Sequence, residues 1–550
     1  MNTAHHHAAA PAAEIRRHPR QPVLLSGAFL MLLSCVTLAA DPPIKLNGPM
    51  VAGGRIVARQ VSADGRTVVY VADQDVDDIF EMYSVPIGGG VPTRLNPPLV
   101  NGGDVRTDFR ITPDGRTVVY LADQNANGVD ELFSVPIGGG TAIKLNKPIP
   151  SAGGLFSFDV SPDGARVVYT GEQDRDGVGE LYSVSVNGGT VTKLNRAMPS
   201  GGNILNRRFI TPDSRRVVYW ADQDTDNVNE IYSVPIEGGT VTKLNAPLPA
   251  GGDIGTFGFG LSPDGSRVIY TGEQTTNNVI ELYSVPIAGG MPSKLNGPLV
   301  SGGAVTSFQV SPDSTRVVYR ADQETNDLSE LYSVPIGGGS ATKLSDPGFG
   351  ALFYFAISAD SSTVVYQSDV DIDELFSVAI DGGLVTRLIA PPSLTDEVSF
   401  FALSNNGSRV VYTTRSLAGP GASVNGDSPP DNGLFSVPIH GGAAVPLAVG
   451  FATGSGVKEF AVSPNSHLVA YAADQDFVGV IELYQVPISG GTREKLSAPM
   501  VSGGDVSDAR FSPDSSAVVY RADQDTDETL ELYSVATGEP SDFLFANGFE

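Results

Sequence analysis

An acidic segment recurs along this sequence, and its carboxylates are the side chains best suited to bind a ligand. In the clearest copies it reads DQDVDDIFE, DQDTDNVNE and DQDTDETLE, with carboxylates at positions 1, 3, 5 and 9. Calcium takes about six to eight oxygen ligands, which a short loop supplies from alternate side chains and a final bidentate carboxylate. The pattern predicts calcium sites formed by Asp73, Asp75, Asp77 and Glu81, by Asp222, Asp224, Asp226 and Glu230, and by Asp523, Asp525, Asp527 and Glu531.

The same segments also fit plain solvated hairpin loops. Asp and Asn side chains in such loops bond to nearby backbone groups and need no metal. Other copies have fewer carboxylates, with Asn125 and Asn127 in the second copy and Thr275 and Asn277 in the fifth. Both interpretations stay open, and neither makes the segment catalytic. If calcium binds, its occupancy should differ between copies.

Residues for nucleophilic or zinc chemistry are scarce. The only cysteine is Cys35, and beyond residue 40 the only histidines are His440 and His467. Both histidines fall in predicted turns, and their separation matches no common zinc-ligand spacing. We therefore predict no catalytic residues and no enzyme.

The acidic segments belong to a repeat that fills most of the chain. A tyrosine that follows two apolar residues recurs about every 50 residues, at Tyr70, Tyr120, Tyr169, Tyr219, Tyr270, Tyr319, Tyr366, Tyr412, Tyr471 and Tyr520. Within a copy, four short apolar runs are separated by Pro-Asp, acidic and Gly-Gly segments, which predicts four antiparallel strands, A to D. In the sixth copy these strands are expected at 308–311, 316–320, 330–336 and 341–344. Consecutive apolar residues in strand B indicate burial on both faces, so the sheets should stack as the blades of a β-propeller.

The two ends of the repeat array complement each other. The last copy ends after its third strand at 533–535, and an isolated fourth strand lies at 44–47. An N-terminal strand that completes the last blade would close the ring without an open sheet edge. The sequence therefore predicts an all-β fold, a single propeller of ten blades over 41–536, with two five-bladed propellers as the alternative.

Strand direction determines which loops share an end of this ring. The acidic loops between strands B and C should lie with the connections from strand D to the next strand A, such as 296–303. The Pro-Asp and Gly-Gly turns should lie at the opposite end. Loops on a rigid scaffold commonly carry binding, and an acidic face attracts basic partners or divalent ions. The acidic end is therefore the predicted binding face.

The repeat resembles a known family in three motifs, namely S-P-D-[G/S], V-V-Y and E-L-Y-S-V. They resemble the WD40-like, or PD40, repeats of the TolB-type β-propeller family over nearly all of 44–535. The resemblance implies the propeller fold, and propellers of this family serve as periplasmic binding scaffolds, as substrate gates of peptidases, or as modules of unknown role. It is limited to the propeller part, because no α/β domain precedes the repeats and no G-x-S-x-G motif of the peptidase relatives is present.

Charge and the N-terminal segment limit the partners and the location. The net charge of -27 repels phosphate backbones, which excludes nucleic acid as a partner. Residues 1–40 combine arginines, an apolar run and Leu-Ala-Ala before Asp41, as in a cleaved secretory signal peptide. A lipoprotein anchored at Cys35 is the alternative. No apolar run is long enough for a permanent membrane span, so we expect a periplasmic or secreted monomer without a transmembrane segment.

Together these observations favour an exported, non-enzymatic scaffold that binds a protein or another ligand. If it binds a protein through the acidic face, that protein should be basic. Two alternatives stay open. One is a hydrolase or lyase with an active site in the propeller channel, which would require polar residues unique to a few blades. The other is a structural cell-surface or secreted protein. Two segments depart from the repeat, an insertion at 416–433 and an apolar tail at 537–550 that either packs on the ring or acts as a sorting signal.

Overall fold

The computed structural model describes residues 41–150, 154–345, 352–369, 373–389, 396–416, 433–452 and 454–539. The predicted signal peptide with Cys35, nearly all of the insertion, and the tail from residue 540 lie outside the described residues. Within the described ranges, the structure contains no helix with the length and apolarity needed to cross a membrane.

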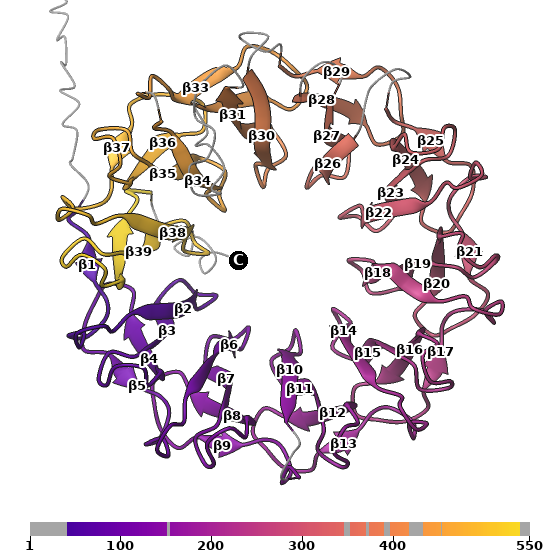
Figure 1. Ribbon diagram of the computed structural model, residues 1–550. Coiled ribbons are helices and arrows are strands. Elements are labelled where there is room, and N and C mark those ends of the chain that lie inside the picture. The colour runs from indigo at the N-terminus through magenta and orange to yellow at the C-terminus, as the bar shows by residue number, and fades with distance from the viewer. Residues whose placement is uncertain are drawn as a thin grey trace, which may run out of the picture. The chain divides into compact units, whose positions relative to one another are not determined.

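The described strands form ten four-stranded antiparallel sheets, which follow one another around a ring in chain order (Figure 1). Each sheet is a blade, and strand A lies innermost. The A strands are β2 Ile56–Val61, β6 Val105–Ile111, β10 Leu155–Val160, β14 Ile204–Ile210, β18 Ile254–Leu261, β22 Val305–Val310, β26 Leu352–Ile357, β30 Asp396–Leu403, β34 Val457–Val462 and β38 Val506–Phe511. The B strands are β3 Thr67–Ala72, β7 Thr117–Ala122, β11 Arg166–Gly171, β15 Arg216–Ala221, β19 Arg267–Gly272, β23 Arg316–Ala321, β27 Thr363–Asp369, β31 Arg409–Ser416, β35 Leu468–Ala473 and β39 Ala517–Ala522.

The outer half of each blade contains a long strand and a short one. The C strands are β4 Glu81–Pro86, β8 Glu131–Pro136, β12 Glu180–Ser185, β16 Glu230–Pro235, β20 Glu281–Pro286, β24 Glu330–Pro335, β28 Asp373–Ala379, β32 Gly433–Pro438, β36 Glu482–Pro487 and β40 Glu531–Ala536. The D strands are β5 Thr93–Arg94, β9 Ile143–Lys144, β13 Thr192–Lys193, β17 Thr242–Lys243, β21 Ser293–Lys294, β25 Thr342–Lys343, β29 Thr386–Arg387, β33 Val445–Ala448, β37 Glu494–Lys495 and, for blade 10, β1 Ile44–Lys45.

The ring is closed by the N-terminal strand. β1 pairs antiparallel with β40, and Lys45 lies opposite Tyr533. Leu46 donates its backbone N–H to the carbonyl of Leu532 at 2.8 Å, and Asn47 Oδ1 accepts the N–H of Leu532 at 2.8 Å. The prediction of one closed, ten-bladed propeller is therefore confirmed, and the alternative of two five-bladed rings is not what the chain forms.

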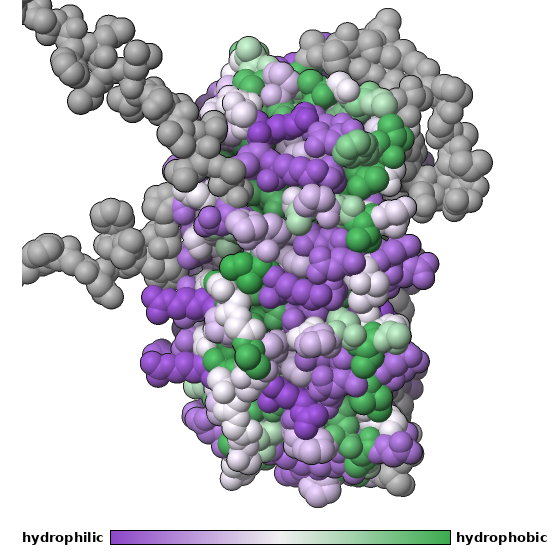
Figure 2. Space-filling view, turned by 90° about the vertical axis from the view of Figure 1, so that its left-hand side faces the viewer, coloured by the Kyte–Doolittle hydropathy of each residue, from purple (hydrophilic) through white to green (hydrophobic). Residues whose placement is uncertain are grey.

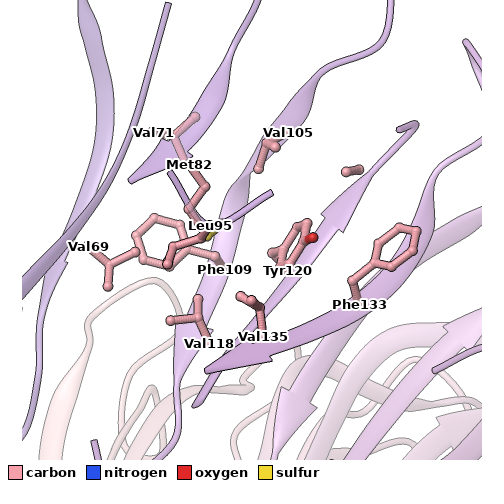
Figure 3. Close-up of a cluster of buried hydrophobic side chains, with 11 residues drawn as sticks. Val69, Val71, Met82, Leu95, Val105, Phe109, Val118, Tyr120, Phe133 and Val135 are labelled. Atoms are coloured by element: carbon pink, nitrogen blue, oxygen red, sulfur yellow. The ribbon is translucent and has the colours of Figure 1, made fainter. Parts of the chain in front are cut away.

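The hydrophobic core lies between adjacent blades. In Figure 3, Val69 and Val71 of blade 1 face Phe109 and Val118 of blade 2. Because strand B has apolar side chains on both of its faces, each B strand contributes to two such interfaces, and Tyr70 is fully buried. A valine or phenylalanine buried in this way contributes roughly 1.5–3 kcal/mol. The stacking of sheets, rather than any single sheet, therefore stabilises the ring.

The turns at one end of the ring are short and locally bonded. Ser62 Oγ donates to Asp64 Oδ1 at 2.5 Å, and this bond lowers the pKa of Asp64. Gly89 and Gly90 of the following turn have φ values of 87° and 142°, which suit glycine.

On the outer side of the ring around β1, hydrophilic and hydrophobic side chains are mixed across the surface rather than separated into patches (Figure 2).

Candidate functional site

The acidic loops lie at the end of the ring where we expected them, together with the D-to-A connections. Val51 of a connection donates its N–H to the carbonyl of Gln74 in the loop at 3.1 Å. Loop positions 3 to 6 are exposed in blades 1 to 6, 9 and 10. Position 6 turns with a positive φ, for example 59° at Asp78 and 61° at Asn227. These four positions form the loop tip that a partner would meet.

The carboxylate at position 1 points inward and connects two segments of backbone. Asp222 is buried, and its oxygens accept the N–H groups of Asn203 at 2.6 Å and Asn227 at 3.0 Å. The predicted ligands Asp73 and Asp523 make the same pair of bonds, with Arg55 and Asp78 and with Asp505 and Glu528. Position 1 therefore ties the loop to the start of strand A.

The glutamate at position 9 faces strand D. Glu230 is buried, accepts the hydroxyl hydrogen of Tyr232 at 2.8 Å and forms an ion pair with Lys243. Burial raises the pKa of Tyr232, and the hydrogen bond to Glu230 and the negative charge of Glu230 raise it further. The other two predicted glutamates have equivalent partners: Tyr83 and Arg94 for Glu81, and Tyr533 and Lys45 for Glu531.

The sequence reasoning missed these cations. A clear signal was present, because the cation follows the glutamate at a constant separation of 13 residues within a blade. The antiparallel register of strands C and D turns that separation into contact. The cations of strand D are Lys45, Arg94, Lys144, Lys193, Lys243, Lys294, Lys343, Arg387 and Lys495.

The aspartates at positions 3 and 5 stay at the loop tip. Asp224 lies 3.5 Å from Lys243 Nζ and 3.3 Å from Arg196 Nη1, whereas Asp525 lies 3.3 Å from Lys45 Nζ. Asp226 covers Gly201, which has a φ of 94°, and a Cβ at Gly201 would lie 2.5 Å from Asp226 Oδ1. Asp77 and Asp527 cover Gly53 and Gly503 in the same way.

The four predicted ligands of each loop therefore have different surroundings. In blade 1 the structure brings Asp73 and Asp77 together with Asp78, with one oxygen of each within 4.8 Å of the others. Asp75 lies at the exposed tip, and Glu81 is bonded to Arg94 and Tyr83. A cation in blade 1 would therefore fit Asp73, Asp77 and Asp78 better than the predicted set. The calcium sites themselves stay predictions.

Exposed carboxylates are distributed unevenly among the described loop tips, and the tips of blades 3 and 4 together have four, Asp174, Asp176, Asp224 and Asp226. The tips of blades 10 and 1, which are neighbours across the closure, have six exposed carboxylates, Asp525, Asp527, Glu528, Asp75, Asp77 and Asp78. The tips of blades 2 and 5 have none, because they consist of residues 125–128 and 275–278. The acidic end is therefore asymmetric.

The inner wall of the ring is less regular than the loops. Seven A strands place a phenylalanine three residues before their terminal Ser or Thr, and Phe109 packs there against blade 1. Blades 1 and 4 place Arg59 and Arg208 at this position instead. The structure thus reveals polar residues unique to a few blades, which we had not recognised in the sequence.

Both arginines are used for contacts between blades. Arg59 is buried, lies 3.4 Å from Asp508 and donates to the carbonyl of Val519 at 3.0 Å. Its burial lowers its pKa to about 10, although Asp508 opposes that shift. Arg208 lies 2.9 Å from Asp159 and donates to Ser157 Oγ at 2.8 Å. These groups are paired by their neighbours rather than directed at a substrate.

The two histidines lie outside both regions. His440 and His467 are exposed in turns, and His467 Nδ1 lies 3.4 Å from Glu539 Oε2. Neither turn is part of the acidic end.

No protein-family model matches this chain, and no curated protein matches it. Among solved structures, a protein assigned as TolB from Agrobacterium tumefaciens is 21% identical over 45% of this chain and 83% of its own, with a TM-score of 0.28. Oligogalacturonate lyase from Vibrio parahaemolyticus is 14% identical over 71% and 100%, with a TM-score of 0.34. Prolyl oligopeptidase B from Galerina marginata is 12% identical over 66% of this chain and 56% of its own, with a TM-score of 0.36. Likeness at this level assigns no partner or reaction to this chain.

Proposed function

We propose that this chain is an exported, non-enzymatic β-propeller scaffold of the TolB type, which binds a basic protein partner through the loop tips of blades 10 and 1. The observation that supports this proposal is the group of six exposed carboxylates on these two adjacent tips. Lys45 and Arg55 are the cations paired with them, at 3.3 Å from Asp525 and 3.9 Å from Asp78. The negative charge is therefore only partly balanced, and it would steer a basic partner to this part of the ring.

The surroundings of the remaining polar groups favour a scaffold over an enzyme. Glu230 and Asp222 exemplify carboxylates that are buried and already bonded to the protein's own N–H, O–H and cationic groups. A general acid or base needs a group free to exchange a proton with a substrate. Among the described residues, no histidine lies beside the exposed carboxylates at the tips, and these carboxylates serve better as a charged docking surface.

The binding proposal is tested with three baits. These are the wild-type chain, a blade 10/1 variant with Asp525→Asn, Asp527→Asn, Asp75→Asn, Asp77→Asn and Asp78→Asn, and a control with Asp174→Asn, Asp176→Asn, Asp224→Asn and Asp226→Asn in blades 3 and 4. Captured periplasmic proteins are quantified at low and high salt. We expect a basic protein that the wild type and the control retain, that the blade 10/1 variant loses at least tenfold, and that salt releases. Equal retention by all three baits would refute the proposed face.

Export is the second part of the proposal. It depends on the sequence of residues 1–40, which resembles a cleaved signal peptide. Cell fractionation and N-terminal sequencing of the mature chain test it, and we expect the mature chain to begin at Asp41 in a soluble periplasmic or secreted fraction. Recovery in the membrane fraction that Cys35→Ala abolishes would instead establish the lipoprotein.

Cation binding in blade 1 is a second candidate property, favoured by the proximity of Asp73, Asp77 and Asp78. A cation that binds only the folded state raises its stability. We expect about 1 mM calcium to raise the melting temperature by several degrees relative to chelator, and Asp77→Asn with Asp78→Asn to abolish the shift. The matched control is Asp224→Asn with Asp226→Asn in blade 4. An unchanged melting temperature in the wild type would rule out calcium as a stabilising ligand.

A further inference from the structure

A groove lies on the inner wall of the ring along β34, the A strand of blade 9. It has a volume of about 410 Å³, which is within the range of roughly 300–1,000 Å³ typical of ligand pockets. Its lining comes from three consecutive blades: Phe400 and Thr413 of blade 8, 457–461 of blade 9, and Arg510 of blade 10. β34 is the first strand of its sheet, so its channel side has no strand beside it.

The surface of the groove is aromatic and apolar. Phe400 is 52% exposed, and its ring lies 5.6 Å from the ring of Phe460. Val457 and Ala461 continue the apolar surface along the strand. In blade 1, by contrast, the corresponding part of the wall carries Arg59 and Gln60, whose side chains bond to neighbouring blades. Exposed apolar side chains that are grouped along a groove are typical of a binding surface.

The rim of the groove is charged. Lys458 is exposed, and Arg510 lies 3.5 Å from Glu459 and 3.4 Å from Asp508. Arg510 is therefore already paired within the fold, so an occupant with aromatic side chains and a carboxylate for Lys458 would complement this groove.

The chain itself has such a segment directly after the last described residue, Glu539. Residues 540–550 include Phe543, Phe545 and Phe549, and they carry acidic side chains at Asp542 and Glu550. The last described residues point toward blade 9, because Gln485 Nε2 donates to the carbonyl of Thr537 at 3.0 Å and Glu539 lies against His467. His467 belongs to the turn that follows β34, so the last described residue, Glu539, lies at the turn that ends this strand.

The length of the segment is sufficient. Residues 540–550 in extended form span about 35 Å, whereas β34 spans about 20 Å. We infer that residues 540–550 bind in the groove along β34, with their phenylalanines on Phe400 and Phe460 and a carboxylate near Lys458. This inference is independent of the proposed binding face, which lies on the loop tips.

Hydrogen exchange on the full mature chain tests the inference. The comparison is between the wild type and a variant with Phe543→Ser, Phe545→Ser and Phe549→Ser, which leaves the described ring unchanged. We expect amides of 457–461 to exchange at least threefold faster in the variant, and those of β22 in blade 6 to remain unchanged. Equal exchange at 457–461 in both proteins would overturn the inference.

Two further measurements identify the occupant. A synthetic peptide of residues 540–550, added to the variant, should restore the protection of 457–461, and Lys458→Glu in the variant should weaken that restoration. The protection in the wild type should not depend on protein concentration. Protection that falls on tenfold dilution would show that the segment comes from a second copy, which would overturn binding within one chain.

Discussion

The loop end and the inner wall of this propeller are built from the same ten repeats, but they use their residues differently. At the loop end, the glutamate equivalent to Glu230 recurs in nine of the ten blades and an acidic residue equivalent to Asp222 in most of them, and the side chains of Glu230 and Asp222 are bonded within the fold. On the inner wall, the residues change from blade to blade, and Phe400 is left exposed. In this molecule the repeated residues hold the ring together, whereas the varying residues of the inner wall either pair between blades, as Arg59 does, or stay exposed, as Phe400 does.

If the repeated residues stabilise the ring, then ionisation of the buried tyrosines of strand B at high pH should unfold it. This alkaline unfolding is the largest effect that we expect. Burial raises the pKa of Tyr319 to about 12, and it raises the pKa of Tyr70 and Tyr219 as well. The tyrosines of the unfolded chain ionise near pH 10, so above that pH the unfolded state binds fewer protons and stability falls, by up to about 1.4 kcal/mol per pH unit for each tyrosine. Below pH 10 this contribution is fully present.

We therefore expect one cooperative loss of structure between about pH 10 and 12, with phenolate absorbance and circular dichroism changing together. Ionisation of most tyrosines before the loss of circular dichroism would show that the tyrosines do not stabilise the ring.

A comparison of two phenylalanines on A strands should show the next largest effect. Phe109 is 1% exposed between blades 1 and 2, whereas Phe400 is 52% exposed on the inner wall. Phe109→Ala leaves a cavity and should cost about 3–5 kcal/mol of unfolding free energy. Phe400→Ala should cost less than about 1 kcal/mol. Urea unfolding measures both costs. Similar losses of unfolding free energy would contradict the view that the repeated position stabilises the ring and the variable position does not.

Within one acidic loop, the buried and exposed carboxylates should differ by a smaller amount. Glu230→Gln removes the charge that pairs with Lys243, and it should cost about 2 kcal/mol. Asp226→Asn changes an exposed tip and should stay within about 0.5 kcal/mol. Thermal or urea unfolding of the two variants tests this, and a larger loss from Asp226→Asn would mean that the tip has a structural role.

The smallest expected effect concerns the glycine beneath the loop tip. Gly201→Ala places a Cβ 2.5 Å from Asp226 Oδ1 and at a φ of 94°, and it should cost about 1–2 kcal/mol. Gly128→Ala is the control, because its φ is 80° but no atom lies within 4 Å of its Cβ. The difference between the two costs in urea unfolding isolates the close approach of Asp226. Equal costs would show that Asp226 moves aside freely.

Much of the fold could be predicted from local patterns. Strand B of the sixth copy was expected at 316–320 and forms β23 Arg316–Ala321, and strand C was expected at 330–336 and forms β24 Glu330–Pro335. Strand A was expected at 308–311 but begins earlier, as β22 Val305–Val310. The sequence before Phe308 varies between copies, and a shift in register between Val305 and Ser307 hides the strand pattern there.

The candidate site was predicted less completely. The alternation of strand direction placed the loops at the correct end of the ring. The spacing of their carboxylates did not show that Glu81 faces Arg94 or that Asp73 bonds to the N–H of Arg55. Those contacts depend on the register of strands C and D and on the course of the D-to-A connection. Carboxylates at alternate positions give the same sequence pattern whether their side chains converge on one metal ion or bond to different neighbours.

The sequence by itself determined the number of blades, the strand order within a blade and the closure by β1, because repeat length, turn residues and apolar runs are local properties. Only the tertiary structure decided which polar side chains are used within the fold. Arg59 and Asp508 are far apart in the chain and meet across the closure between blades 10 and 1. A side chain's energy depends on the atoms that surround it, and in a ring of stacked sheets many of those atoms belong to the neighbouring blades.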